Sequence, residues 1–170
     1  MARTNRRAVF SPYKSAIAHV MCRVVRRCRL MGDDPVTGKN YDHRKRWIED
    51  LLRHHAAYFG IDLLCYAILC NHMHLILRTN PAIVQQWSDE EVAMRWLMLC
   101  PKRKLPDGSP AEPNQNEINT IVNDVLKLAE IRSRLSDISW WMRLMNQKIA
   151  QRANAEEEIK GHFWEARFRA

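Results

Sequence analysis

Acidic residues are missing from the first 30 positions of the sequence, although the whole chain has 19 of them. The same segment carries eight of the 27 basic residues: Arg3, Arg6, Arg7, Lys14, Arg23, Arg26, Arg27 and Arg29. The formal net charge of +8 therefore resides entirely in this segment. Such a concentration favours a polyanionic partner, most commonly nucleic acid, and the alternative is a solvated basic face. An anionic membrane surface fits less well, because no large apolar face accompanies the charge.

The sequence also lacks long apolar runs and paired cysteines. No stretch approaches the length of a membrane-spanning helix, and the basic N-terminus has no uninterrupted apolar core of the signal-peptide type. Five cysteines are present, an odd number, and none forms a CxxC pair. We therefore expect free thiols, a cytoplasmic location and no membrane partner. The length of 170 residues suits a single domain spanning 1–170.

Alternating hydrophobicity predicts four strands, at 17–27, 61–69, 72–79 and 163–169. A helix is expected between the first two strands and further helices before the last one. This order is that of a ferredoxin-like (RRM-like) α+β fold, an antiparallel sheet with helices packed on one face. The first and third strands would then be central, and the other face of the sheet would be open for a ligand.

Four segments have the hydrophobic periodicity of a helix: 42–59, Ser88 through Leu97, near 118–134 and 137–155. Ser88 and Glu91 have the spacing of a capping box. Residues 100–117 contain four of the seven prolines and are expected to be an exposed insertion, because too little chain remains for a second core.

Two histidines, His72 and His74, are separated by one residue in the third expected strand. In a strand, residues i and i+2 point to the same side, so both imidazoles should leave one face together. Such a pair can hold a divalent metal ion when a third ligand comes from elsewhere, although the spacing alone also fits structural histidines. By contrast, His54 and His55 lie near the end of the first helix, where a histidine suits the helix dipole.

The segment Asn71-His72-Met73-His74 resembles the HUH motif (His, hydrophobic, His) of single-tyrosine transposases, with Cys70 where a proline often precedes it. Further segments resemble the REP-associated branch of that family in the same order: "HVMCRVVRR", "YDHRKRWIEDLL", "FGIDLLCYAILCNHMHLIL", "WSDEEVAMRW", "DISWWMRLMNQKIAQRAN" and "GHFWEARFRA". The likeness covers nearly the whole chain, so it is more specific than one HxH motif.

The resemblance implies an enzyme that cuts and rejoins single-stranded or hairpin DNA through a 5′-phosphotyrosine. A divalent ion, Mg or Mn, would be held by His72 and His74 and would stabilise charge on the scissile phosphate. Contacts to DNA are expected from the first and last strands, at His19, Arg23, Arg26, Arg27, Trp164, Arg167 and Arg169. Relatives occur as monomers and as dimers, so a homodimer is one of two expected states.

The nucleophile does not fit this pattern. All four tyrosines, Tyr13, Tyr41, Tyr58 and Tyr66, precede His72, whereas the family's nucleophile follows the histidine motif. We therefore expect the catalytic tyrosine helix to be missing beyond Ala170 and this chain to be inactive as a transposase. The alternatives are an inactive transposase remnant, a non-catalytic RRM-like nucleic-acid-binding module or a small metalloenzyme of another kind. A "GFGFV"-like strand and an HExxH motif, which would favour the last two, are absent.

Overall fold

Three antiparallel strands form one sheet in the computed structural model, which describes residues 14–25 and 28–170. The strands are β1 (Ile17–Arg23), β2 (Ile61–Ile68) and β3 (His72–Thr79), and their spatial order is β1-β3-β2. β3, which carries the two histidines, is therefore the central strand. The expected α+β class is confirmed, and the two strands of the 61–79 hairpin lie where the alternation predicted them.

Alternation along β1 and β3 gives the sheet one buried and one open face. Ala18, Val20 and Cys22 of β1 are buried, as are Met73, Leu75 and Leu77 of β3. In an antiparallel pair, directly opposed residues point to the same side, and Val20 lies opposite Leu75. These apolar rows form the half of the core that the sheet supplies.

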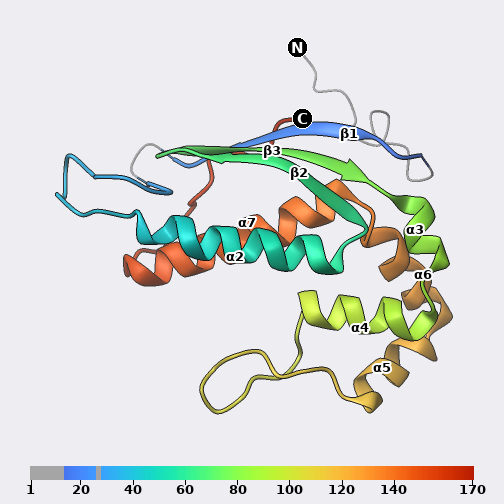
Figure 1. Cartoon of the computed structure of the whole chain (residues 1–170). Helices are drawn as coiled ribbons and strands as arrows, with labels where there is room; N and C mark the ends of the chain where they lie inside the picture. The colour runs from blue at the N-terminus through green and yellow to red at the C-terminus, as the bar shows by residue number, and fades with distance from the viewer. Residues whose placement is uncertain (1–13, 26–27) are drawn as a thin grey trace.

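Six helices accompany the sheet within the described residues: α2 (His43–Tyr58), α3 (Pro81–Gln86), α4 (Asp89–Leu99), α5 (Gln115–Val122), α6 (Val125–Arg134) and α7 (Ile138–Glu156). Figure 1 shows α2 and α7 lying along one face of the sheet, with α4 and α5 farther from it. No described helix covers the other face. Within the same part of the chain, no helix has both the length and the apolar character needed to cross a membrane.

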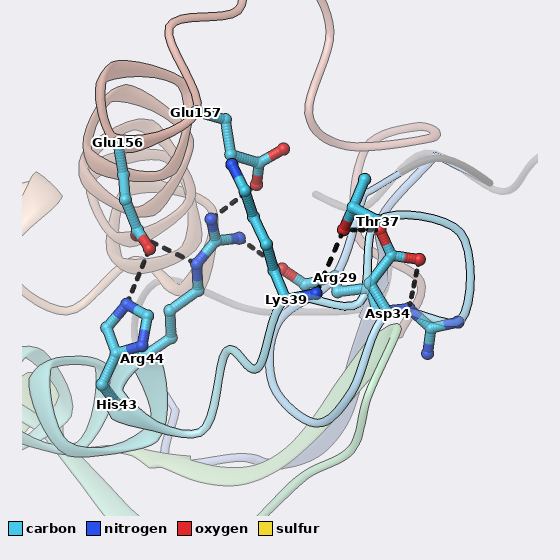
Figure 2. A network of polar contacts seen from close by, with 8 residues as sticks. All are labelled: Arg29, Asp34, Thr37, Lys39, His43, Arg44, Glu156 and Glu157. Carbon is cyan, nitrogen blue, oxygen red and sulfur yellow. Dashed lines mark hydrogen bonds and ion pairs between the residues drawn. The ribbon is translucent and has the colours of Figure 1, made fainter.

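A buried arginine joins the start of α2 to the end of α7 (Figure 2). Arg44 is fully buried and donates to Glu156 at 3.0 Å, to Glu157 at 2.5 Å and to the Arg29 carbonyl at 2.6 Å. Its guanidinium also lies 4.1 Å from the centre of the Tyr41 ring. Glu156 and Glu157 place two negative charges at the C-terminal end of α7, where the helix dipole is also negative. The positive charge of Arg44 offsets this repulsion. The network therefore fixes the loop before α2 against the core.

Four expectations differ from the observed elements. Residues 163–169 do not form a strand but make two isolated bridges to the first-strand segment, Met21 with Arg169 and Val24 with Trp164. That segment is regular only to Arg23, not to residue 27. The helix expected at 118–134 is divided into α5 and α6, because the Asp124 side chain caps a new helix by accepting from Lys127 N. The short α3 was not predicted.

The predicted capping box at the start of α4 is half formed. Ser88 Oγ accepts from Glu91 N at 3.1 Å, but the Glu91 carboxylate pairs with Arg95 one turn later. A reciprocal capping box is found instead at Asn114 and Glu117, where α5 begins. The proline-rich insertion before it is an exposed loop with one internal bridge, between Lys104 and Pro110.

Candidate metal centre and nucleic-acid interface

His72 and His74 leave the open face of the sheet from its central strand. Their neighbours Met73 and Leu75 are fully buried on the other side, whereas both histidines are partly exposed. The two ring centres are 5.1 Å apart and the ring planes are nearly perpendicular, at 81°. This separation allows one nitrogen of each ring to reach a common ion at about 2.1 Å.

Each of these rings has its Nδ1 atom engaged by a neighbour. His72 Nδ1 lies 2.7 Å from Oδ1 of Asn71, the residue just before the strand. His74 Nδ1 lies 2.8 Å from Nε2 of His19, which comes from β1. The His19 and His74 rings meet edge to edge, with centres 5.0 Å apart and planes 14° from parallel. Within the described part of the chain, neither His72 Nε2 nor His74 Nε2 has a hydrogen-bond partner.

The pKa of His74 is lowered from its ordinary value. Partial removal from water is the main cause, and the neighbouring His19 and His72 rings lower the pKa further. His74 is therefore neutral near pH 7. A neutral imidazole has a free lone pair on one nitrogen, which is the state that binds metal ions.

The donor set at this site is two imidazoles. Among the described residues, no group of three or more His, Cys, Asp or Glu side chains is arranged to hold a metal ion. An ion at His72 and His74 would therefore take its remaining ligands from water or from a bound phosphate. Imidazole nitrogens bind transition-metal ions, including Mn²⁺ at the weak end of the series, more readily than Mg²⁺, which prefers an all-oxygen shell.

Two arginines share the open face with the histidines. Arg23 lies directly opposite His72 in the β1–β3 pairing, and Arg169 bridges to Met21, which lies opposite His74. Both arginines are exposed, and neither has an acidic partner within residues 14–25 and 28–170. Arg78, at the far end of β3, is instead paired with Asp62 at 2.7 Å. The uncompensated positive charge therefore lies beside the histidines.

The other residues predicted to contact DNA lie in different places. Trp164 and Arg167 line a cleft of about 990 Å³ between α7 and the C-terminal segment. Trp164 is half-buried, and its Nε1 donates to the Asn146 carbonyl at 2.8 Å, so it belongs partly to the core. Arg26 and Arg27 lie outside the described residues.

The three described tyrosines do not face the histidine pair. Tyr66 lies opposite Leu75 on the helix side of the sheet, and its hydroxyl donates to Glu49 of α2 at 3.1 Å. Tyr41 is buried beneath Arg44, and the Tyr58 ring lies 4.9 Å from His54 on α2. Tyr13 lies outside the described residues. No described tyrosine hydroxyl is therefore positioned to attack a phosphate at His72 and His74.

From the sequence, His19 was expected on the open face, in contact with DNA or with the metal-binding histidines, but its partner His74 was not specified and Asn71 was assigned no role. The alternation gives the face of each residue, but the contact depends on how far β1 is shifted along β3. In that register, His19 lies opposite Ile76 and reaches His74 diagonally. No protein-family model, curated protein or solved structure matches this chain, so a functional assignment depends on the site itself.

Proposed function

We propose that this chain is the DNA-binding body of an HUH-type single-tyrosine transposase, and that it binds single-stranded or hairpin DNA on the open face of its sheet. The observation that carries the proposal is the presence of His72 and His74 side by side on the open face of the central strand, with Nε2 atoms that have no partner among the described residues. Both imidazoles are partly exposed, and they lie beside arginines that have no acidic partner within residues 14–25 and 28–170.

The arrangement of the chain supports a ferredoxin-like fold for this body. The segment 163–169 lies beside β1, so the spatial order is the C-terminal segment, β1, β3 and β2. The described helices lie on one face of the sheet, as that fold requires (Figure 1). Two bridges in place of a regular fourth strand are the departure from the complete pattern.

His72 and His74 would hold a divalent ion, for which we favour Mn²⁺. When bound, the ion would polarise a DNA phosphate and stabilise charge developing on it. Arg23 and Arg169 bind neighbouring phosphates and orient the strand across the sheet. The His19 ring and the exposed part of Trp164 offer flat surfaces to unpaired bases.

A second candidate, binding without cleavage, is favoured by the positions of the tyrosines. Strand cleavage in the proposed family needs a tyrosine hydroxyl in line with the phosphate. Tyr41, Tyr58 and Tyr66 all lie away from the histidine pair. This chain is accordingly a non-catalytic nucleic-acid-binding module or the remnant of a transposase, unless the hydroxyl comes from outside the described residues.

Fluorescence anisotropy with a labelled hairpin DNA tests the proposal. We expect Mn²⁺ to tighten binding by the parent chain, and the variant His72→Ala plus His74→Ala to lose this metal dependence. The control is His43→Ala, an exposed histidine of α2 on the helix side of the molecule. Equal Mn²⁺ dependence in the parent and the double variant would overturn the metal assignment, and no binding to any hairpin or single strand would overturn the proposed function.

A covalent adduct assay separates binding from cleavage. After incubation with labelled hairpin DNA and Mn²⁺, we expect no protein–DNA adduct on a denaturing gel. An adduct that disappears with Tyr13→Phe would show that this chain carries its own nucleophile, and the binding-only candidate would be rejected.

A further inference from the structure

We infer that Asn71 and His19 are positioning residues that keep the proton of His72 and His74 on Nδ1, so that both Nε2 lone pairs face one divalent ion. The inference rests on the proposed function, because it concerns the same histidine pair. It adds the two side chains that prepare the pair, one from the turn before β3 and one from the neighbouring strand β1.

The Asn71 contact determines the proton position on His72. Oδ1 of Asn71 lies 2.7 Å from His72 Nδ1, and an amide oxygen can only accept a hydrogen bond. Nδ1 of His72 must therefore be the donor. In a neutral ring the other nitrogen, Nε2, then carries the lone pair, which is the atom free to bind a metal.

The His19 contact acts on His74 in the same way. Two ring nitrogens 2.8 Å apart share one proton, so one donates and the other accepts. We assign the proton to His74 Nδ1 and the accepting lone pair to His19 Nε2. With this assignment His74 has the same tautomer as His72, and the two rings offer the same atom to an ion.

Both contacts have the form of the outer hydrogen bonds found around metal-binding histidines. Such a ligand usually donates its second ring nitrogen to a carbonyl, carboxylate or other acceptor, which fixes the tautomer and the direction of the ring. Removing such an acceptor typically lowers metal affinity about 10- to 100-fold. A site with only two protein ligands depends strongly on this preparation, because each misdirected ring removes half of the protein's donors.

The test reads the tautomers directly, by long-range ¹H–¹⁵N NMR of the chain with ¹⁵N-labelled histidine, first without metal and then with Zn²⁺. Exposed thiols bind Zn²⁺, so the measurement uses a Cys65→Ser plus Cys70→Ser background. We expect Nδ1–H in both His72 and His74, and a Zn²⁺-dependent shift of both Nε2 signals.

Two pairs of variants divide the roles. Asn71→Asp keeps an oxygen acceptor and should retain the Nδ1–H tautomer of His72, whereas Asn71→Leu removes it. His19→Gln keeps a neutral acceptor and should retain the tautomer of His74, whereas His19→Phe keeps an aromatic ring without an acceptor. By calorimetry, we expect the Leu and Phe variants to bind Mn²⁺ about 10- to 100-fold more weakly than the parent. His43→Gln, at an exposed histidine of α2, is the matched control.

The outcomes distinguish this inference from the proposed function. His74 found with its proton on Nε2, or Asn71→Leu and His19→Phe leaving the tautomers and the Mn²⁺ affinity unchanged, would overturn the inference while the metal site stands. A parent chain that binds no Mn²⁺ would overturn the metal assignment, and the tautomers measured without metal would still decide what Asn71 and His19 do.

Discussion

Helix α2 and strand β3 each carry two histidines close together in sequence, and the two pairs have opposite surroundings. His54 and His55 are consecutive on a helix, so their side chains diverge, with ring centres 6.2 Å apart. His55 is fully buried against the Phe59 and Trp141 rings, whereas His54 is half-buried and donates to the Met98 carbonyl. His72 and His74, two apart on a strand, leave the same face together. The backbone period therefore decides whether neighbouring imidazoles can act on one ligand.

Burial separates the chemistry of the two pairs further. The pKa of His55 is lowered to about 3, mainly because the ring is removed from water and in addition because the charge of Lys148 is nearby. His55 Nδ1 lies 3.0 Å from the Leu51 carbonyl, and its Nε2 has no partner among the described residues. Together with Arg44, this histidine makes α2 a helix whose polar residues serve stability. His72 and His74 of β3 are partly exposed, and we assign them to binding.

The largest effect that tests this comparison is the pH dependence of stability caused by His55. Its pKa is about 3 in the folded chain and near 6.5 when unfolded, so the unfolded state binds the extra proton between these values. The contribution of neutral His55 to the free energy of unfolding is complete above about pH 7. As the pH is lowered, this contribution decreases by about 1.4 kcal/mol per pH unit, and the total loss is on the order of 5 kcal/mol near pH 3. Urea unfolding between pH 7 and pH 4.5 measures this slope.

The variant His55→Leu isolates that contribution, because leucine cannot titrate. We expect the slope of its free energy of unfolding against pH to be smaller than that of the parent, by the amount that corresponds to about one bound proton. The exposed His162→Gln serves as the control and should keep the parent slope. Equal slopes for the parent and His55→Leu would show that His55 is accessible to protonation in the folded chain.

Arg44 provides the next largest effect. Arg44→Met leaves Glu156 and Glu157 without their buried partner, and removing one member of a buried ion pair typically costs about 3–5 kcal/mol. Chemical denaturation at pH 7 should show this loss. Adding Glu156→Gln and Glu157→Gln to the same chain should recover part of it, since the stranded charges are then removed; a triple variant no more stable than Arg44→Met would contradict the ion-pair explanation.

Arginines on the open face should affect binding and not folding. Each phosphate contact to single-stranded DNA contributes about 0.7 to the slope of log K against log salt, so Arg23→Gln plus Arg169→Gln should reduce the slope by about 1.4. Anisotropy titrations at several salt concentrations measure it. Lys45→Gln plus Arg46→Gln removes the same charge from exposed positions of α2 and should change the slope less. Equal reductions in the two variants would mean that net charge alone governs binding.

The smallest effect is the change in folding stability that we expect when the His72 and His74 side chains are removed. His72→Ala plus His74→Ala removes partly exposed side chains and solvent-accessible hydrogen bonds, so the free energy of unfolding without metal should change by no more than about 1 kcal/mol. Thermal unfolding followed by circular dichroism checks this. A loss as large as that of Arg44→Met would place the pair among the structural polar groups and remove the contrast with α2.

Much of the sheet and the faces of its residues could be predicted from the sequence. The β3 boundaries were predicted to the residue. Met73, Leu75 and Leu77 occupy every second position of this strand, so only one choice of faces buries all three. Helix α2 was predicted to within one residue at each end. The dipole interpretation of His55 was wrong, because burial keeps this ring neutral.

The remaining features depend on contacts that a local pattern does not contain. Arg169 bridges to Met21 of β1 and Trp164 to Val24 just after β1, but a bend at residues 165–167 separates the two bridges and prevents a regular strand. Asp124 ends the helical pattern through a side-chain cap that competes with continuation of the helix. The contact of His19 with His74 required the register of β1 on β3, which is set by the whole sheet.

His72 and His74 are two positions apart in β3 and therefore lie on the same face, which has a consequence for the kinds of mutation that affect them. A substitution removes one imidazole and leaves the other in place. An in-frame loss or gain of a single codon that shifted β3 by one residue against its neighbours would turn both imidazoles inward and Met73 outward in one event. With respect to such shifts, the two histidines therefore behave as one unit.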